Sequence, residues 1–533
     1  MTMTRCEHRL RDKRGGRGAR SGPWLAAALF LLVTAPALPA TPSQAPGPGF
    51  KQAVNQQVAA ARRIAPELGV HVVELESGDT VYSFHPDTVR IAASNTKLFT
   101  SAAALDRLGP GFFFETEVLI RGELHNGTLA GDLAIVGGGD PSISGRQYNG
   151  DSFGVFRRWA AALRERGVER IAGELVLVHG LFDRETVHPD WPRDQLTRWY
   201  EAPVSALSFN DNCVLVRVRP TGRSGRAARV EVVPPLPMFE VDSNARTTSR
   251  RRRQWLRIDR RTGERSHVLT VAGLIASRTE SVDKWVAVSD PVRYFGAALR
   301  AALAEEGIEL EGPLRPAASL AEVGQLPDAG LRAAANPFPG MDVRRPAKGS
   351  GWRRVLTHRT DLLTVLEVIN KRSQNFYAES LLKLLGARLC GAGNWPAGVR
   401  VVEEFVEEIG LGTRGWSLAD GSGMSRRNRL APRQLTGLLR HMFFHRWGGE
   451  FMRTLPYSGE PDLRWDKRLA EAPYRGNVLA KTGSLSGVSA LSGYAKARSG
   501  KIYAFSILCN RSRSNAQAMT AQDRIVKAVI DHG

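Results

Sequence analysis

The sequence predicts an α/β (α+β) fold, in which both ends of the chain build one domain around a large strand-rich insertion. Residues 68–84 alternate apolar and polar side chains around a Gly-Asp turn, a pattern typical of a β-hairpin. Residues 481–510 indicate two or three further strands, and residues 516–530 indicate a final helix packed against them. We therefore expect the two ends to form one antiparallel sheet. Between them, residues 112–144 and 203–290 carry strand patterns and few long helices.

The length of the chain indicates two or three domains, at about 100–200 residues per domain. We assign residues 55–128 and 350–533 to the terminal domain and residues 129–349 to the insertion. The insertion is expected to contain two smaller strand-rich domains, with residues 203–290 as the inner one. Within the strand-rich part, Asn126-Gly127 is a strong signal for a hairpin turn.

Residues 1–40 indicate a signal peptide. Residues 5–20 carry six arginines and one lysine, and residues 24–33 form an apolar core too short to span a bilayer comfortably. An uncleaved membrane anchor is the alternative. Residues 41–54, which begin with TPSQAPGPGF, are predicted to be a flexible linker. We therefore expect an exported protein, periplasmic or extracytoplasmic, with membrane association as the alternative.

The formal net charge of +21 favours anionic partners. Much of the charge is concentrated in one arginine-rich segment: Arg246, Arg250 to Arg253, Arg257, Arg260, Arg261 and Arg265. An exported protein rarely meets nucleic acid, so we do not expect nucleic-acid binding. Contact with an anionic wall polymer or with membrane phospholipid is one interpretation. An arginine-biased composition with a solvated face is the other.

The cysteines and histidines do not indicate a metal site. Cys6 lies in the segment expected to be removed, and an odd number without metal-ligand spacing remains: Cys213, Cys390 and Cys509. At most one disulfide can form among them, and we expect buried thiols. His441 and His445 are four residues apart, but the glutamate of a zinc-protease motif is absent, so both are interpreted as structural. No metal or cofactor is predicted.

A Ser-x-x-Lys motif, from Ser94 to Lys97, begins a predicted helix. Apolar residues recur at helical spacing through residues 98–108, so Lys97 is expected one turn along on the same face as Ser94. Ser281 also begins a Ser-x-x-Lys sequence. It precedes the short apolar run 285–288, which is typical of a strand, and we interpret Ser281 as structural.

The chemistry of acyl transfer explains why these residue types occur together. A serine hydroxyl needs a base, and a lysine can serve only if burial and neighbouring cations lower its pKa. We therefore expect Ser94 to be the nucleophile and Lys97 its base, with Lys481 supplying positive potential. Attack on an amide builds an oxyanion, for which the backbone N–H groups of Ser94 and Ser484 are the candidate donors.

Two further motifs lie downstream, Ser373-Gln374-Asn375 and Lys481-Thr482-Gly483. We expect Ser373 to pass a proton to the departing amine and Asn375 to orient Lys97 and the substrate amide. Lys481 and Thr482 are expected to hold a substrate carboxylate, with Gly483 and Ser484 completing the substrate-binding strand. The predicted reaction proceeds through a covalent acyl-enzyme.

The order Ser-x-x-Lys, Ser-x-Asn, Lys-Thr-Gly is that of penicillin-binding proteins and serine β-lactamases. Four further runs, at residues 137–141, 210–212, 373–382 and 420–426, resemble the penicillin-binding protein 4 type D-alanyl-D-alanine carboxypeptidase/endopeptidases, the low-molecular-weight class C penicillin-binding proteins. The resemblance runs from about residue 55 to the C-terminus. It implies a penicillin-binding/β-lactamase-like catalytic domain interrupted by inserted domains.

The resemblance also implies a serine DD-peptidase that acts on peptidoglycan stem peptides and is acylated by β-lactam antibiotics. The implied activity is carboxypeptidase, endopeptidase or both. A β-lactamase is an alternative, but the chain has no Glu-x-x-Leu-Asn segment between Ser373 and Lys481, and the large insertion is foreign to that class. A non-catalytic wall-binding scaffold is another, although such a protein would be free to lose Ser94, Lys97 or Lys481.

Some positions depart from the family pattern. Gln374 stands where the family often has aspartate, and Met424 replaces a common leucine. Arg426 matches the carboxylate-binding arginine of the family. Where the family often places an aspartate that meets an amino group of the substrate, counting back from Ala202-Pro203 reaches Gln195. The neighbouring Asp194 is the alternative.

Overall fold

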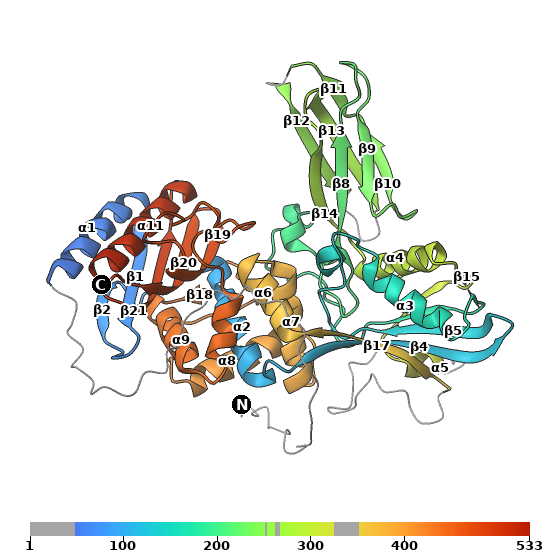
Figure 1. The fold of residues 1–533 in the computed structure, drawn as a ribbon, viewed down its shortest axis with the longest axis horizontal. Coiled ribbons are helices and arrows are strands. Elements are labelled where there is room, and N and C mark those ends of the chain that lie inside the picture. The colour runs from blue at the N-terminus through green and yellow to red at the C-terminus, as the bar shows by residue number, and fades with distance from the viewer. Residues whose placement is uncertain (1–47, 251–252, 262–266, 325–350) are drawn as a thin grey trace.

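The computed structural model describes residues 48–250, 253–261, 267–324 and 351–533 (Figure 1). The predicted signal peptide lies outside these residues. Elements from the two ends of the chain, blue and red in Figure 1, lie side by side in one body, with helices in the middle and the inserted strands on the other side. Within the described ranges, no helix is both long enough and apolar enough to cross a membrane.

The two ends of the chain form one five-stranded antiparallel sheet, in the order β19-β20-β21-β1-β2. The predicted hairpin and the predicted C-terminal strands are therefore confirmed. The strands are β1 (Glu67–Glu74), β2 (Thr80–Phe84), β19 (Val478–Leu485), β20 (Val488–Lys496) and β21 (Ile502–Asn510). Helices α1 (Pro48–Ile64) and α11 (Asn515–His532) pack together on this sheet and share its core.

Helix α1 corrects the predicted linker, because residues 48–54 are helical. Pro48 and Gly49, from the run that indicates a linker, are the first two residues of the helix, where proline is tolerated. Phe50, Val54, Val58 and Ala61 follow at helical spacing, and all four are buried against the sheet.

A cluster of helices and a short two-stranded sheet cover the opposite side of the terminal domain, where α9 contacts β1, β20 and β21. This region supplies the helix predicted after Ser94. Its elements are β3 (Arg90–Ile91), η1 (Ala93–Asn95), α2 (Thr96–Leu108), α6 (Leu362–Lys371), α7 (Asn375–Leu389), α8 (Trp395–Glu408), β18 (Arg429–Leu430), α9 (Pro432–Phe444) and α10 (Gly448–Thr454).

The insertion contains a seven-stranded sheet covered by α3 (Gly154–Arg164) and α4 (Pro291–Glu305). The predicted boundaries at residues 129 and 349 cut through this sheet, because β4 and β17 belong to it. Asn126-Gly127 forms the turn between β4 and β5, as the hairpin signal predicts. The remaining elements are β4 (Phe113–His125), β5 (Thr128–Val136), η2 (Gly145–Gln147), β6 (Arg170–Ile171), β7 (Leu175–Val178), β15 (Glu309–Leu310), β16 (Leu314–Ala317), α5 (Ala321–Gly324) and β17 (Arg353–Asp361).

A second strand unit projects from the insertion (Figure 1) and encloses its own small core. It comprises β8 (Cys213–Arg219), β9 (Arg229–Val233), β10 (Glu240–Ser243), β11 (Arg246–Thr248), β12 (Trp255–Arg260), β13 (Val268–Ala276) and β14 (Val282–Ala287). Ser281 lies immediately before β14, so the strand predicted after it is present. Arg260 is buried and donates to the carbonyl of Ala287 at 3.1 Å, which removes it from the predicted solvated face. Arg265 lies outside the described residues.

The described cysteines and the two histidines have packed environments. Cys213 and Cys509 are buried thiols, and the half-buried thiol of Cys390 contacts a backbone carbonyl. His445 contacts the carboxylate of Asp106 at 3.1 Å, and its ring lies next to that of His441. Among the residues that the structure describes, no group of three or more His, Cys, Asp or Glu is placed to hold a metal ion.

Gly493→Ala tests the tight pairing of β19 and β20. An added methyl group would lie 2.1 Å from the carbonyl oxygen of Leu479 and 2.5 Å from Cα of Ala480, so β19 must move. We expect a loss of about 1–3 kcal/mol in the free energy of unfolding, measured by urea denaturation. Gly449→Ala is the matched control, since nothing lies within 4 Å of its added methyl group and its stability should be unchanged or slightly raised. Equal stability of both variants would contradict the packing described here.

Candidate active site

Lys97 is the buried centre of the site. It lies in the first turn of α2 and has 0% of its surface exposed, whereas Ser94, in the preceding η1 turn, is half-buried. The Lys97 amine lies 3.1 Å from the hydroxyl oxygen of Ser94. It also donates to Asn375 Oδ1 at 2.7 Å and to the carbonyl of Ser422 at 2.6 Å. Three separate segments of the chain therefore hold one amine.

Burial changes the protonation of both lysines at the site. It lowers the pKa of Lys97 to about 7, although the carboxylates of Glu379 and Asp420 act in the opposite direction. Burial, the charge of Lys97 and that of Arg464 lower the pKa of Lys481 well below its ordinary value. A substantial fraction of Lys97 is therefore neutral near pH 7, and a neutral amine can accept a proton.

Lys481 lies on β19 and is 1% exposed. Its amine donates to the hydroxyl of Ser373 at 2.7 Å and to the carbonyl of Thr482 at 3.1 Å. Ser373 has a φ of 58°, in the left-handed region that residues other than glycine rarely adopt, which turns its hydroxyl toward β19. The side-chain amide of Asn95 donates to the carbonyl of Lys481 at 2.7 Å and so joins the strand to the Ser94 turn.

Gly483 allows β19 to approach the Ser94 turn closely. A methyl group at this position would lie 2.8 Å from the carbonyl oxygen of Ala92 and 3.0 Å from the backbone nitrogen of Ser94. The following Ser484 is exposed, and its hydroxyl accepts from Asn515 at 3.0 Å. β19 is the edge strand of the sheet, and its first part is already paired, since Val478 bonds to Ser458 and Ala480 to Pro456. A bound peptide can therefore pair only with the later part of this edge.

Asn375 connects Lys97 to the inserted part of the chain. Its side-chain amide donates to the carbonyl of Tyr200, in η4 (Trp199–Glu201), at 2.8 Å. The hydroxyl of Tyr200 donates in turn to Gln195 Oε1, in η3 (Arg193–Gln195), at 3.0 Å. Gln195 is therefore linked to Asn375 only through Tyr200, and the neighbouring Asp194 is exposed.

Arg426 lies at the rim of the site. It is exposed, and its guanidinium donates to the carbonyl of Ser486, in the turn between β19 and β20, at 2.6 Å. The structure thus brings Ser94 and Lys97 together with the Ser373, Asn375 and Lys481 side chains. It places Gln195 and Arg426 farther out, where each contacts another residue.

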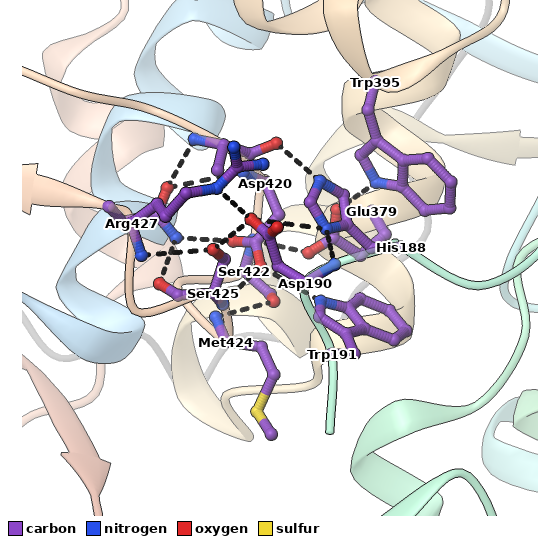
Figure 2. A network of polar contacts seen from close by, with 12 residues as sticks. His188, Asp190, Trp191, Glu379, Trp395, Asp420, Ser422, Met424, Ser425 and Arg427 are labelled. Carbon is purple, nitrogen blue, oxygen red and sulfur yellow. Dashed lines mark hydrogen bonds and ion pairs between the residues drawn. The ribbon is translucent and has the colours of Figure 1, made fainter. Parts of the chain in front are cut away.

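Two buried acids, which the motifs do not single out, hold the loop that contacts Lys97. Figure 2 shows both acids, Glu379 and Asp420, beside Ser422 of that loop. Glu379 accepts from Trp395 Nε1 at 2.8 Å and from two backbone N–H groups of the loop. Asp420 accepts from Trp191 Nε1 at 3.1 Å and from the backbone N–H groups of Gly423 and Ser425. Both acids fall in runs that carry the family resemblance. Glu379 is the one acidic residue of α7 (Asn375–Leu389), and this was the available signal for it.

The second motif is also supported by the insertion, through Gln374. Its amide donates to Asp211 Oδ2 at 2.8 Å, and the same carboxylate is paired with Arg146. Asp211 lies in η5 (Asn210–Asn212), whose three residues have φ values of 52°, 57° and 50°. This strained turn is thus fixed against the segment that carries Ser373 and Asn375. Glutamine in place of the family's aspartate provides the N–H donor for this contact.

Gln374→Glu tests this contact with a side chain of the same length. The change replaces the N–H donor by a carboxylate oxygen facing Asp211, so the repulsion should displace Ser373 and slow acylation by a β-lactam about tenfold or more. Adding Asp211→Asn restores a donor and should recover most of the rate. The measurement is the acylation rate with a reporter β-lactam for both variants. No recovery in the double variant would show that the pairing does not position the motif.

The comparisons with known proteins agree with this geometry. The sequence matches the D-Ala-D-Ala carboxypeptidase 3 (S13) family over residues 51–326 and 339–530. It is 31% identical over 546 residues to the D-alanyl-D-alanine carboxypeptidase of Actinomadura sp. (strain R39), covering 98% of this chain and 93% of the relative. It is 24% identical to D-alanyl-D-alanine carboxypeptidase DacB of Haemophilus influenzae, covering 82% of this chain and 84% of the relative.

The fold is similar to the crystal structure of penicillin binding protein 4 (dacB) from Haemophilus influenzae. The TM-score is 0.71 at 24% identity, with 88% of this chain and 97% of that chain covered. A structure of that protein complexed with a β-lactam gives a TM-score of 0.68 at 23% identity, covering 89% and 99%. The predicted fold class, family resemblance and serine-peptidase class are confirmed. This chain belongs to the D-Ala-D-Ala carboxypeptidase 3 (S13) family.

Proposed function

We propose that this protein is a serine DD-peptidase that cleaves D-alanyl peptide bonds of peptidoglycan stem peptides through an acyl-enzyme on Ser94. The observation that carries the proposal is the 3.1 Å contact between the Ser94 hydroxyl and the fully buried amine of Lys97. Family membership favours this activity over a β-lactamase and over a non-catalytic scaffold. The same serine would be acylated by β-lactam antibiotics.

The first half of the reaction forms the acyl-enzyme. Neutral Lys97 takes the hydroxyl proton of Ser94, and Ser94 Oγ attacks the carbonyl carbon of the substrate amide. The backbone N–H groups of Ser94 and Ser484 stabilise the oxyanion that develops. The C–N bond then breaks, and Ser373, whose hydroxyl is in contact with Lys481, passes a proton to the departing amine. Ser373 regains a proton from the Lys97 ammonium, so Lys97 is neutral again.

The second half releases the acyl group. A water molecule, or the amino group of another peptide, attacks the ester carbon and gives a proton to neutral Lys97. The ester C–O bond then breaks, and Lys97 returns the proton to Ser94 Oγ. Lys481 and Thr482 would hold the substrate's terminal carboxylate, because Lys481 presents its amine beside Ser373. Arg426 and Gln195 lie farther out, and we propose that they contact the rest of the stem peptide. No cofactor takes part in this scheme.

The site of action follows from the substrate. We infer that the protein is exported by its N-terminal segment and acts outside the cytoplasmic membrane, with residues 1–40 cleaved or kept as an anchor. The arginine-rich segment, where it is exposed, would favour contact with anionic wall or membrane surfaces.

Product analysis tests the substrate assignment. The exported form is incubated with purified muropeptides, and the products are identified by mass. Loss of a terminal D-alanine is expected from carboxypeptidase activity, and conversion of cross-linked dimers to monomers from endopeptidase activity. Absence of both products, with Ser94→Ala as the blank, would overturn the proposal.

Ser94→Ala should abolish covalent labelling by penicillin, because the nucleophilic oxygen is lost. Ser281→Ala is the matched control. It removes the serine of the other Ser-x-x-Lys sequence, before β14, and should label like the unchanged protein. Labelling is measured by intact mass and by mapping the modified peptide. Label on Ser281, or persistent label in the Ser94 variant, would refute the assignment of the nucleophile.

The rate of acylation should rise with pH through a value near 7. Lys97 acts only when neutral, and burial lowers its pKa to about 7, so the active fraction grows as pH increases through that value. The rate with a reporter β-lactam is measured across the pH range. Lys97→Arg should be nearly inactive at every pH, because a guanidinium does not lose its proton in this range. Substantial activity in that variant would require another base.

A further inference from the structure

Glu379 lies one helical turn after Asn375 on α7, so both side chains point from the same face toward the site. Its side chain has 0% exposure. Three N–H donors nevertheless satisfy its two carboxylate oxygens: Trp395 Nε1 at 2.8 Å, the backbone of Gly421 at 3.0 Å and the backbone of Ser422 at 2.8 Å. Burial and the charge of Asp420 raise the pKa of Glu379 to about 7, whereas these hydrogen bonds favour the ionised form. The carboxylate is therefore charged in a large fraction of molecules at pH 7 and above.

The loop held by Glu379 is the one that receives Lys97. The N–H group of Ser422 donates to Glu379, and the carbonyl of the same residue accepts from the Lys97 amine at 2.6 Å. Gly423, the next residue, has a φ of 82°, and an added methyl group there would lie 1.9 Å from the carbonyl oxygen of Ala93. The loop is therefore fixed between Glu379, shown beside Ser422 in Figure 2, and the turn that carries Ser94.

The charged groups near Glu379 and Lys97 are the following. Lys97 interacts with two acids, Glu379 and Asp420, and with one cation, Lys481. On its other side, Glu379 interacts with Lys383. Lys383 is balanced by its own partners, because it is paired with Asp183 at 2.6 Å and lies over the Trp395 ring.

We propose that Glu379 is a positioning residue for Lys97, which fixes the Ser422 backbone beneath the amine and supplies a negative charge close to it. The proposal deepens the proposed function and rests on it, since it concerns the base of the same reaction. Asp420 also places a negative charge near Lys97. Asp420, however, belongs to the loop that contacts Lys97. Glu379 acts from α7, which also presents Asn375.

Glu379→Gln is the direct test. Loss of the negative charge destabilises the protonated amine and lowers the pKa of Lys97. The midpoint of the rising pH profile for acylation should therefore move to lower pH, by about one unit. The amide also places an N–H group against one of the three donors, so the maximal rate should fall about tenfold. Rates are measured with a reporter β-lactam, and the labelled fraction by mass corrects for inactive protein.

Two further variants separate this role from a purely structural one. Glu403→Gln makes the same chemical change at a half-buried acid on α8, away from Lys97, and should leave the midpoint unchanged. Trp395→Phe keeps a ring over Lys383 but removes one donor to Glu379. It raises the pKa of Glu379 and should shift the midpoint in the same direction by a smaller amount. It also carries the test if Glu379→Gln does not fold.

An unchanged midpoint in Glu379→Gln, or in Trp395→Phe where the first variant does not fold, would overturn the proposal. The maximal rate alone would not decide, because a disturbed core also lowers it. If the unchanged protein is not acylated on Ser94, the proposed function fails instead. If it is acylated and its profile has a midpoint that Glu379→Gln leaves in place, only the role of Glu379 fails.

Discussion

The site depends on keeping one lysine amine out of water. Removing an ammonium group from water is costly, and proteins offset the cost by hydrogen bonds or by releasing the proton. Lys97 has both responses available. As an ammonium group, Lys97 donates to the oxygen atoms of Ser94, Asn375 and Ser422. As a neutral amine, it donates to Asn375 and Ser422 and accepts from the Ser94 hydroxyl. These atoms come from distant parts of the sequence, so the pocket exists only when the whole domain is folded.

The insertion contributes hydrogen bonds to the residues that form this pocket. Tyr200 accepts from Asn375, Asp211 accepts from Gln374, and Trp191 donates to Asp420. Asn375 itself contacts Lys97, Gln374 lies between Ser373 and Asn375, and Asp420 lies two residues before Ser422. The strained Asn210–Asn212 turn is consistent with this role, since such backbone conformations persist only where surrounding contacts hold them. Catalytic geometry is therefore shared between the terminal domain and the insertion.

The sequence predicts the local features well and the distant contacts poorly. The helix after Ser94, the first hairpin and the last strands follow from spacing within a few residues. Motif order groups Lys97 with Ser373 and Lys481, and the structure places these side chains together. The partnership of Tyr200 with Asn375 leaves no local pattern, because it joins a backbone carbonyl to a side chain 175 residues away. The predicted boundaries of the insertion differ from the observed sheet for a similar reason. β4 pairs with β17 across the whole insertion, and no local pattern indicates this pairing.

The sheet closed by both chain ends also imposes an order of assembly. Asn510, on β21, makes two hydrogen bonds with the backbone of Ile91, 419 residues earlier and just before the Ser94 turn. Contacts at such separation form late, because the loop between them must be closed first. The inserted sheet can be complete once β17 is present, whereas the turn that presents the serine waits for β21. Reactivity of the serine is thus withheld from partly synthesised or partly folded chains and appears only with the finished domain.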